Sequence, residues 1–211
     1  KKISKNFKDV LKNQLKIIRY PSIWILGLAS ATMYVTRYAI NSWGVLYLQE
    51  GRGYSLIEAG GLVGLNTFTG IIGCVAYGYI SDKYFGARRP PVTLMFGIAE
   101  IGSLFLIFYG PQSTLVLTIA FIIYGFSLSG LLAVLGGLFA IDIAPKNITG
   151  AAMGFIGLFS YIGAAIQEKV SSVLIKSTQP DVNSELIYDF DSVIIFWMSA
   201  SVVSFFLSLS L

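Results

Sequence analysis

The sequence contains no histidine, a single cysteine and few charged residues. Charged side chains make up 12% of the 211 residues and hydrophobic ones 55%, whereas about a quarter of the residues of a soluble domain are charged. Without histidine, and with Cys74 as the only cysteine, the chain lacks histidine-based catalysis, intrachain disulfides and cysteine-based metal sites. No glycine-rich loop leads from a strand into a helix. We therefore expect neither an enzyme nor a metal or cofactor site.

Long apolar segments dominate the sequence instead. A helix needs about 20 apolar residues to cross a bilayer, and the turn at residues 110–113 divides a stretch that is too long for one span. Because the chain starts at Lys1 and stops inside an apolar run, we interpret it as half of a larger transporter. The pattern predicts an all-α, polytopic membrane protein with six transmembrane helices, at 21–48, 59–81, 90–110, 114–141, 148–175 and 191–211.

Positive charge gathers in alternate loops. Residues 1–19 hold seven basic side chains against one acid. Since positively charged loops stay in the cytoplasm, we expect the amino terminus on that side. Residues 1–19 are interpreted as an amphipathic linker or surface helix, and residues 20–211 as the transmembrane bundle. The basic residues of the later loops follow the second and fourth segments: Lys83, Arg88, Arg89 and Lys146.

Glycine recurs in the second and fifth segments, which hold equivalent places in two groups of three. Small residues let membrane helices approach closely or slide past each other. The similarity predicts a 3+3 inverted repeat, an arrangement found in many secondary transporters. Static helix packing is the alternative interpretation of each glycine.

Arg37 is the only ionised side chain of the first segment. A cation at membrane depth costs about 3 kcal/mol on insertion scales, so it requires an anionic ligand, an acid or a water-filled path. Tyr34, Tyr38 and Asn41 lie three or four residues away and share its helix face. The planar guanidinium suits phosphate or carboxylate, which favours an anion-binding site. A structural ion pair with Glu100 of the third segment is the alternative.

Charged groups elsewhere permit two interpretations each. Asp82, Lys83, Arg88 and Arg89 between the second and third segments form either a charge latch at the cytoplasmic face or a solvated loop. Glu100 is either a proton-coupling residue or a structural acid.

The fifth segment has Tyr161 near mid-depth and Lys169 about two turns further on. Lys169 either contacts substrate, extends to the membrane surface or compensates Glu168.

Three stretches of the chain carry a family resemblance: 34–48 around Arg37, 78–83, and 144–163. They resemble the carboxy-terminal half of the organophosphate:phosphate antiporters of the major facilitator superfamily. The resemblance implies the last six helices of a twelve-helix carrier, in which Arg37 binds phosphate together with an arginine of the missing amino-terminal half. Tyr34 and Tyr161 are similar to substrate-cavity tyrosines of glycerol-3-phosphate carriers. Such carriers rock two halves about a site at the midplane.

The chain departs from glycerol-3-phosphate carriers at three positions. Thr67, beside Asn66, stands where those carriers have an acid, Ser129 where they have a tyrosine, and Phe139 where they have a histidine. Smaller and more polar side chains favour a hexose phosphate, with glycerol-3-phosphate as the alternative. The predicted substrate-binding residues are Arg37, Tyr34, Asn41, Tyr161, Asn66, Thr67, Ser129 and Lys169.

These observations lead to three hypotheses of function. The first is a bacterial inner-membrane carrier that exchanges an organic phosphate for inorganic phosphate by alternating access. The second is a sugar-phosphate sensor of the same family that signals to a histidine kinase. The third is a proton-coupled exporter of amphipathic compounds, which requires an essential acid such as Glu100. The expected partners are the two phosphates, the lipid bilayer and the missing amino-terminal half, with no nucleic acid.

Overall fold

The computed structural model describes residues 15–178 and 187–211, so most of the proposed linker over residues 1–19 lies outside the described residues. Its last part, η1 (Leu15–Arg19), is a short 3₁₀ helix. The first span is continuous from Pro21 to Gly51 and consists of α2 (Pro21–Tyr38), the π-helical turn η2 (Ala39–Trp43), α3 (Gly44–Leu46) and the π-helical turn η3 (Tyr47–Gly51).

Five further helical spans follow. The fourth is again composite, because the π-helical turn η4 interrupts it. A short hairpin joins the last two spans, with residues 176–178 of β1 antiparallel to residues 187–189 of β2. The elements are α4 (Leu56–Tyr84), α5 (Arg89–Tyr109), α6 (Thr114–Ala133), η4 (Val134–Leu138), α7 (Phe139–Ile143), α8 (Thr149–Leu174), β1 (Lys176–Thr178), β2 (Ile187–Asp189) and α9 (Asp191–Leu209).

The six predicted spans are thus confirmed, with small shifts at their ends. Local signals account for several of these ends. Proline lies in the first turn of α2 and of α5. The N–H groups of a first turn have no acceptor within the helix, so proline, which has no N–H, costs no hydrogen bond there. Ser55 and Glu58 form a capping box that starts α4: the Glu58 carboxylate accepts from Ser55 N at 3.0 Å, and Ser55 Oγ accepts from Glu58 N at 3.4 Å.

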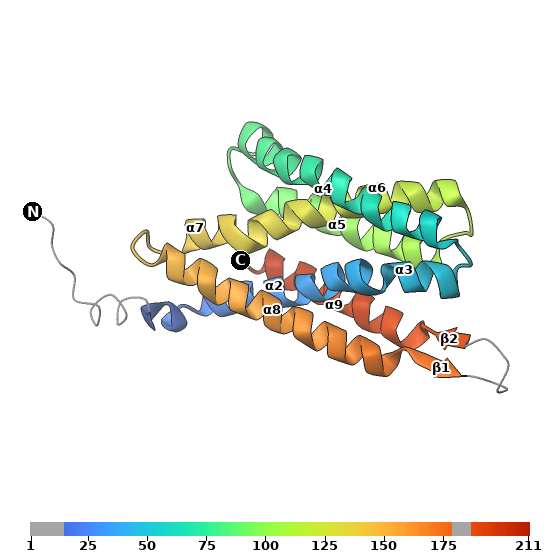
Figure 1. The fold of residues 1–211 in the computed structure, drawn as a ribbon. Coiled ribbons are helices and arrows are strands. Elements are labelled where there is room, and N and C mark those ends of the chain that lie inside the picture. The colour runs from blue at the N-terminus through green and yellow to red at the C-terminus, as the bar shows by residue number, and fades with distance from the viewer. Residues whose placement is uncertain (1–14, 179–186) are drawn as a thin grey trace, which may run out of the picture.

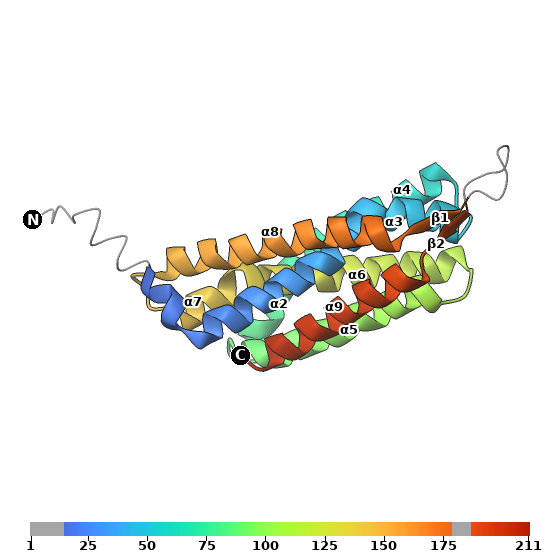
Figure 2. The same cartoon turned by 90° about the horizontal axis from the view of Figure 1, so that it is seen from below.

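The helices pack as two equivalent groups of three (Figure 1). The first span packs mainly on α8 and α9, and the fourth mainly on α4 and α5. If spans one, two and three are replaced by spans four, five and six, and the reverse, one set of contacts becomes the other. The third and sixth spans, α5 and α9, pack on each other along one edge of the bundle (Figure 2). The predicted 3+3 repeat is therefore present in the packing.

Glycines occupy the two tightest helix crossings. A methyl group on Gly73 of α4 would lie 1.9 Å from the Phe126 carbonyl oxygen, and one on Gly163 of α8 would lie 2.2 Å from that of Ala31. Both crossings therefore require glycine for close approach. Gly60, Gly61, Gly154 and Gly157 instead face open space, so only some of the repeated glycines serve packing within this chain.

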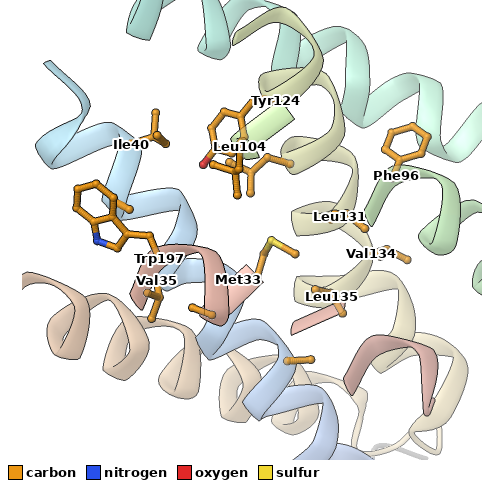
Figure 3. Close-up of a cluster of buried hydrophobic side chains, with 14 of the residues drawn as sticks. Met33, Val35, Ile40, Phe96, Leu104, Tyr124, Leu131, Val134, Leu135 and Trp197 are labelled. Carbon is orange, nitrogen blue, oxygen red and sulfur yellow. The ribbon is translucent and has the colours of Figure 1, made fainter. Parts of the chain in front are cut away.

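The interior between the spans is filled by large apolar side chains, including Met33, Leu131 and Trp197 (Figure 3). Buried hydroxyls link helices across it: Ser30 and Ser160 share a hydrogen bond of 2.7 Å, and Ser204 donates to the Ala29 carbonyl at 2.8 Å. We call the end of the bundle with Pro21, Tyr84 and Arg89 the basic end, and the other the hairpin end.

Candidate functional site

A cavity of about 580 Å³ lies between the first, second and fourth spans. Its volume falls within the range of small-molecule sites. Five of the predicted substrate-binding residues line it, brought together from η2, α2, α4 and α6. The lining residues are Arg37, Asn41, Asn66, Thr67, Gly70, Ile71, Cys74, Val75, Leu128, Ser129, Leu132 and Ala133.

Arg37 lies in the last turn of α2 and is the only ionised side chain that lines this cavity. Across residues 15–178 and 187–211, no carboxylate oxygen lies within 4.0 Å of its guanidinium. The alternative ion pair with Glu100 is absent, because Glu100 accepts a hydrogen bond from Ser201 instead. The charge of Arg37 therefore has no acid beside it in the described structure.

Aromatic rings surround the guanidinium in place of an acid. Arg37 Cζ lies 5.4 Å from the ring centroid of Tyr34 and 5.9 Å from that of Tyr38, distances at which a ring attracts a cation. Tyr34 contacts Tyr161 of α8 edge to face, with centroids 5.9 Å apart. The tyrosines expected at Arg37 thus lie next to it, although neither Tyr34 nor Tyr161 lines the cavity itself.

Two amide side chains connect the first and second spans beside Arg37. Asn66 Nδ2 donates to Asn41 Oδ1 over 3.4 Å, and Asn66 is only 5% exposed. Asn41 belongs to the π-helical turn η2, which α-helical spacing did not predict. Such turns often occur at functional sites because the wider turn redirects side chains.

The cavity is polar at mid-span and apolar towards the basic end. Thr67 and Ser129 add hydroxyls near the amides, and Ser129 fits against Gly70, where a methyl group would lie 2.2 Å from Ser129 Oγ. Ile71 and Val75, further along α4, form the apolar part. Cys74 also lines the cavity and is exposed. Its position two turns after Thr67 is the sequence signal that would have identified it.

Lys169 does not join this group. Its side chain is exposed and does not line the cavity. No ion pair with Glu168 forms in the described part of the chain; instead, Glu168 Oε2 accepts a hydrogen bond from Trp43 Nε1 at 3.0 Å. That contact between α8 and η2 holds the π-helical turn against the fifth span.

Arg89 is the centre of the charged group at the basic end. Its guanidinium bonds Asp82 at 3.0 Å, Ser81 Oγ at 3.0 Å and Asp142 of α7 at 3.3 Å. It therefore connects the ends of the second, third and fourth spans. The sequence pattern did not lead us to Asp142, although an acid at the end of an apolar span is a signal that could have identified it.

The other two predicted latch residues lie outside this ion-pair group. Lys83 donates to the Tyr79 hydroxyl, and its ammonium lies 4.9 Å and 5.6 Å from the ring centroids of Tyr79 and Tyr84. Arg88 is exposed and has no carboxylate within 4.0 Å among the residues that the structure describes.

The sequence matches the profile of the Major Facilitator Superfamily over residues 1–167. The Membrane sensor protein UhpC of Escherichia coli (strain K12) is 36% identical over 156 residues, which are 71% of this chain and 34% of that protein. The Glycerol-3-phosphate transporter of Bacillus subtilis (strain 168) is 33% identical over 160 residues, 75% of this chain and 34% of that protein.

A third relative is the Probable hexose phosphate transport protein of Chlamydia trachomatis serovar D. It is 36% identical over 147 residues, 68% of this chain and 32% of that protein. The chain spans about half the length of these relatives.

Proposed function

Since this chain belongs to the major facilitator superfamily, in its organophosphate:phosphate antiporter family, we propose that it forms half of a carrier that exchanges an organic phosphate for inorganic phosphate. The observation that carries this proposal is Arg37, the only ionised side chain of a mid-membrane cavity and one without a carboxylate beside it in the described residues. A phosphate would bring the negative charge that no neighbouring acid supplies to this guanidinium.

Phosphate suits Arg37 for geometric and energetic reasons. The guanidinium presents a fork of donors that two phosphate oxygens accept together. Its charge at membrane depth costs about 3 kcal/mol without compensation, and a bound phosphate supplies that compensation. Both exchanged substrates carry this group, so each stabilises the loaded carrier in the same way. Exchange then needs neither ATP nor an ion gradient.

We favour a hexose phosphate as the organic substrate. Asn41, Asn66, Thr67 and Ser129 place amides and hydroxyls beside Arg37, where the hydroxyls of a sugar would follow its phosphate. This chain has a similar percentage identity to two relatives, one named as a probable hexose phosphate transport protein and one as a glycerol-3-phosphate transporter. Glycerol-3-phosphate is therefore the second candidate.

A second half of the same protein completes the proposed carrier. We assign the chain to the carboxy-terminal half, with a further arginine facing Arg37 from the amino-terminal half across the midplane. We assign the basic end to the cytoplasmic side, because loops rich in lysine and arginine favour that side. We place the protein in a bacterial inner membrane, in keeping with its bacterial relatives.

A sensor is the other candidate function, favoured by the similarity to Membrane sensor protein UhpC. Such a protein would bind the same anion at Arg37 without moving it across the membrane. Uptake into vesicles separates the two functions, because a sensor binds sugar phosphate and transports none.

The test is uptake of labelled glucose-6-phosphate by the complete protein in phosphate-loaded vesicles. Arg37→Lys keeps the charge but loses the bidentate fork, and we expect uptake to fall about 10- to 100-fold, as for one lost charge-assisted bond of about 1.5–3 kcal/mol. The matched control is Arg88→Lys, at an exposed arginine outside the cavity. Uptake that needs no internal phosphate, or that survives Arg37→Lys unchanged, refutes the proposal.

A further inference from the structure

The indole of Trp43 and the carboxylate of Glu168 form a contact to which the proposed exchange assigns no part. Trp43 Nε1 donates to Glu168 Oε2 over 3.0 Å, and this bond joins the first span to the fifth. Both side chains are only partly exposed, and neither lines the cavity at Arg37. A carboxyl group within a membrane-spanning helix is rare and usually serves a function, so the group that it holds is informative.

Trp43 is the last residue of the π-helical turn η2, where the first span returns to α-helix. Its φ is −111°, whereas the φ of Tyr38 before the turn is −75° and that of Gly44 after it is −60°. The π-helical turn has wider spacing than the α-helices on either side, so it sets the direction of the side chains that it carries. The bond to Glu168 therefore acts at the point where the backbone changes its geometry.

Glu168 belongs to a helix that is fixed against the first span. Gly163 of α8 crosses α2 so closely that a methyl group on it would lie 2.2 Å from the carbonyl oxygen of Ala31. Ser160, just before Gly163, shares a hydrogen bond of 2.7 Å with Ser30. Glu168 follows Gly163 by five residues, about 7.5 Å along the helix axis. These two contacts therefore set the level of the carboxylate along the first span.

Asn41 is the residue of the π-helical turn that lines the cavity. Its Oδ1 accepts a hydrogen bond from Asn66 Nδ2, but at 3.4 Å that bond is long and orients the amide only weakly. Asn41 and Trp43 belong to one turn of five residues, so a bond that fixes the indole also fixes the backbone that carries Asn41. A polar side chain that has to meet one particular hydroxyl of a ligand depends on support of this kind.

We propose that Glu168 is a positioning residue for sugar recognition, which acts through Trp43 on Asn41. The carboxylate holds the indole, the indole holds the π-helical turn, and the turn directs the Asn41 amide towards a hydroxyl of the bound sugar. Arg37 lies in α2, before the π-helical turn, so its contact with phosphate does not require this bond. This inference rests on the proposed function, because it requires a sugar phosphate in the cavity.

The experiment compares the KM for labelled glucose-6-phosphate with the KM for inorganic phosphate, both measured as exchange by the complete protein in phosphate-loaded vesicles. Trp43→Phe keeps an aromatic ring and removes the donor, and Glu168→Ala removes the acceptor. We expect each variant to raise the KM for glucose-6-phosphate about 3- to 10-fold, as for the weakening of one hydrogen bond to the sugar. The KM for phosphate should stay within about twofold of the wild type, because Arg37 is unchanged.

Two further variants and a control separate positioning from a general loss of stability. The double variant should raise the KM for glucose-6-phosphate no further than either single variant, because the two groups form one bond. Glu168→Gln keeps an acceptor oxygen and should restore a KM within about twofold of the wild type. The matched control is Trp24→Phe, since the Trp24 indole donates to the carbonyl oxygen of Ile18 over 2.8 Å at the basic end and does not line the cavity. Its KM values should equal those of the wild type.

Equal increases of both KM values would show that the contact serves only the fold, and they overturn the inference. An unchanged KM for glucose-6-phosphate in Trp43→Phe overturns it too, as do additive losses in the double variant or a Glu168→Gln protein no better than Glu168→Ala. Each of these results can occur in a carrier whose exchange still requires internal phosphate and Arg37. A failure here is therefore distinct from a failure of the proposed exchange.

Discussion

At the scale of single residues, the cavity combines one strong cation with weakly engaged amides. Arg37 has rings at 5.4 and 5.9 Å rather than an acid beside it. The bond between Asn66 and Asn41 is long, at 3.4 Å, so each amide retains capacity for a ligand. In the proposed carrier, the cation would provide affinity for any phosphate, and the amides would distinguish the organic groups attached to it.

We therefore expect Asn66→Ala to separate the two substrates. Loss of one amide that binds a sugar hydroxyl should raise the KM for glucose-6-phosphate about 5- to 10-fold, as for a hydrogen bond of about 1 kcal/mol. Phosphate–phosphate exchange should keep its KM within about twofold, because inorganic phosphate has no sugar to bind. Both rates are measured in the same vesicles, with Asn147→Ala at an exposed loop position as control. Equal losses for both substrates contradict a role in sugar recognition.

At the scale of elements, the bundle depends on how closely α4 approaches α6 and α8 approaches α2. Gly73 and Gly163 hold equivalent places in the two groups of three helices, and each faces the backbone of its partner helix. In a bilayer, where lipid tails are as apolar as leucine, such close packing supplies much of the association energy. The wall of the cavity formed by α4 and α6 therefore depends on the crossing at Gly73.

Gly73→Ala should destabilise the protein, because the added methyl group would meet a carbonyl oxygen at 1.9 Å and force the two helices apart. Overpacking of this kind costs about 1–3 kcal/mol, which should appear as a lower Tm in detergent. Gly78→Ala in the same helix has open space around it and should leave Tm unchanged or raise it, since alanine favours helix. A Gly73→Ala protein as stable as Gly78→Ala would show that the crossing tolerates separation.

At the scale of the whole molecule, the hydropathy and charge of the sequence predicted those structural features to which many residues contribute together. The six spans follow from some 20 residues each, and the neighbours of Arg37 follow from spacing along one helix. The π-helical turns, the contact of Trp43 with Glu168 and the bond from Arg89 to Asp142 were not predictable in this way. Each depends on the packing of helices far apart in the sequence, and no local pattern encodes that packing.

The ion-pair group around Arg89 should control access to the cavity from the basic end. Arg89 joins the ends of the second, third and fourth spans, and apolar residues line the cavity on that side. Its side chain is 15% exposed, while those of Asp82 and Asp142 are 66% and 46% exposed, so each pair contributes at most about 1 kcal/mol. Loss of both ion pairs in Arg89→Gln should raise the ratio of molecules open at the basic end to molecules closed there by a few-fold.

Cys74 provides the measurement, because it is the one cysteine of the chain and lines the cavity. With cysteines outside this chain replaced, a membrane-impermeant maleimide applied to the cytoplasmic face should label Cys74 about two- to fivefold faster in Arg89→Gln than in the wild type. Saturating glucose-6-phosphate should slow labelling in both, since the sugar would occupy the same cavity. Arg88→Gln, at an arginine without an ion pair in the described residues, should label at the wild-type rate. Equal rates in all three proteins would mean that Arg89 only fastens the loop, and that the closure of the basic end depends on contacts with the proposed second half.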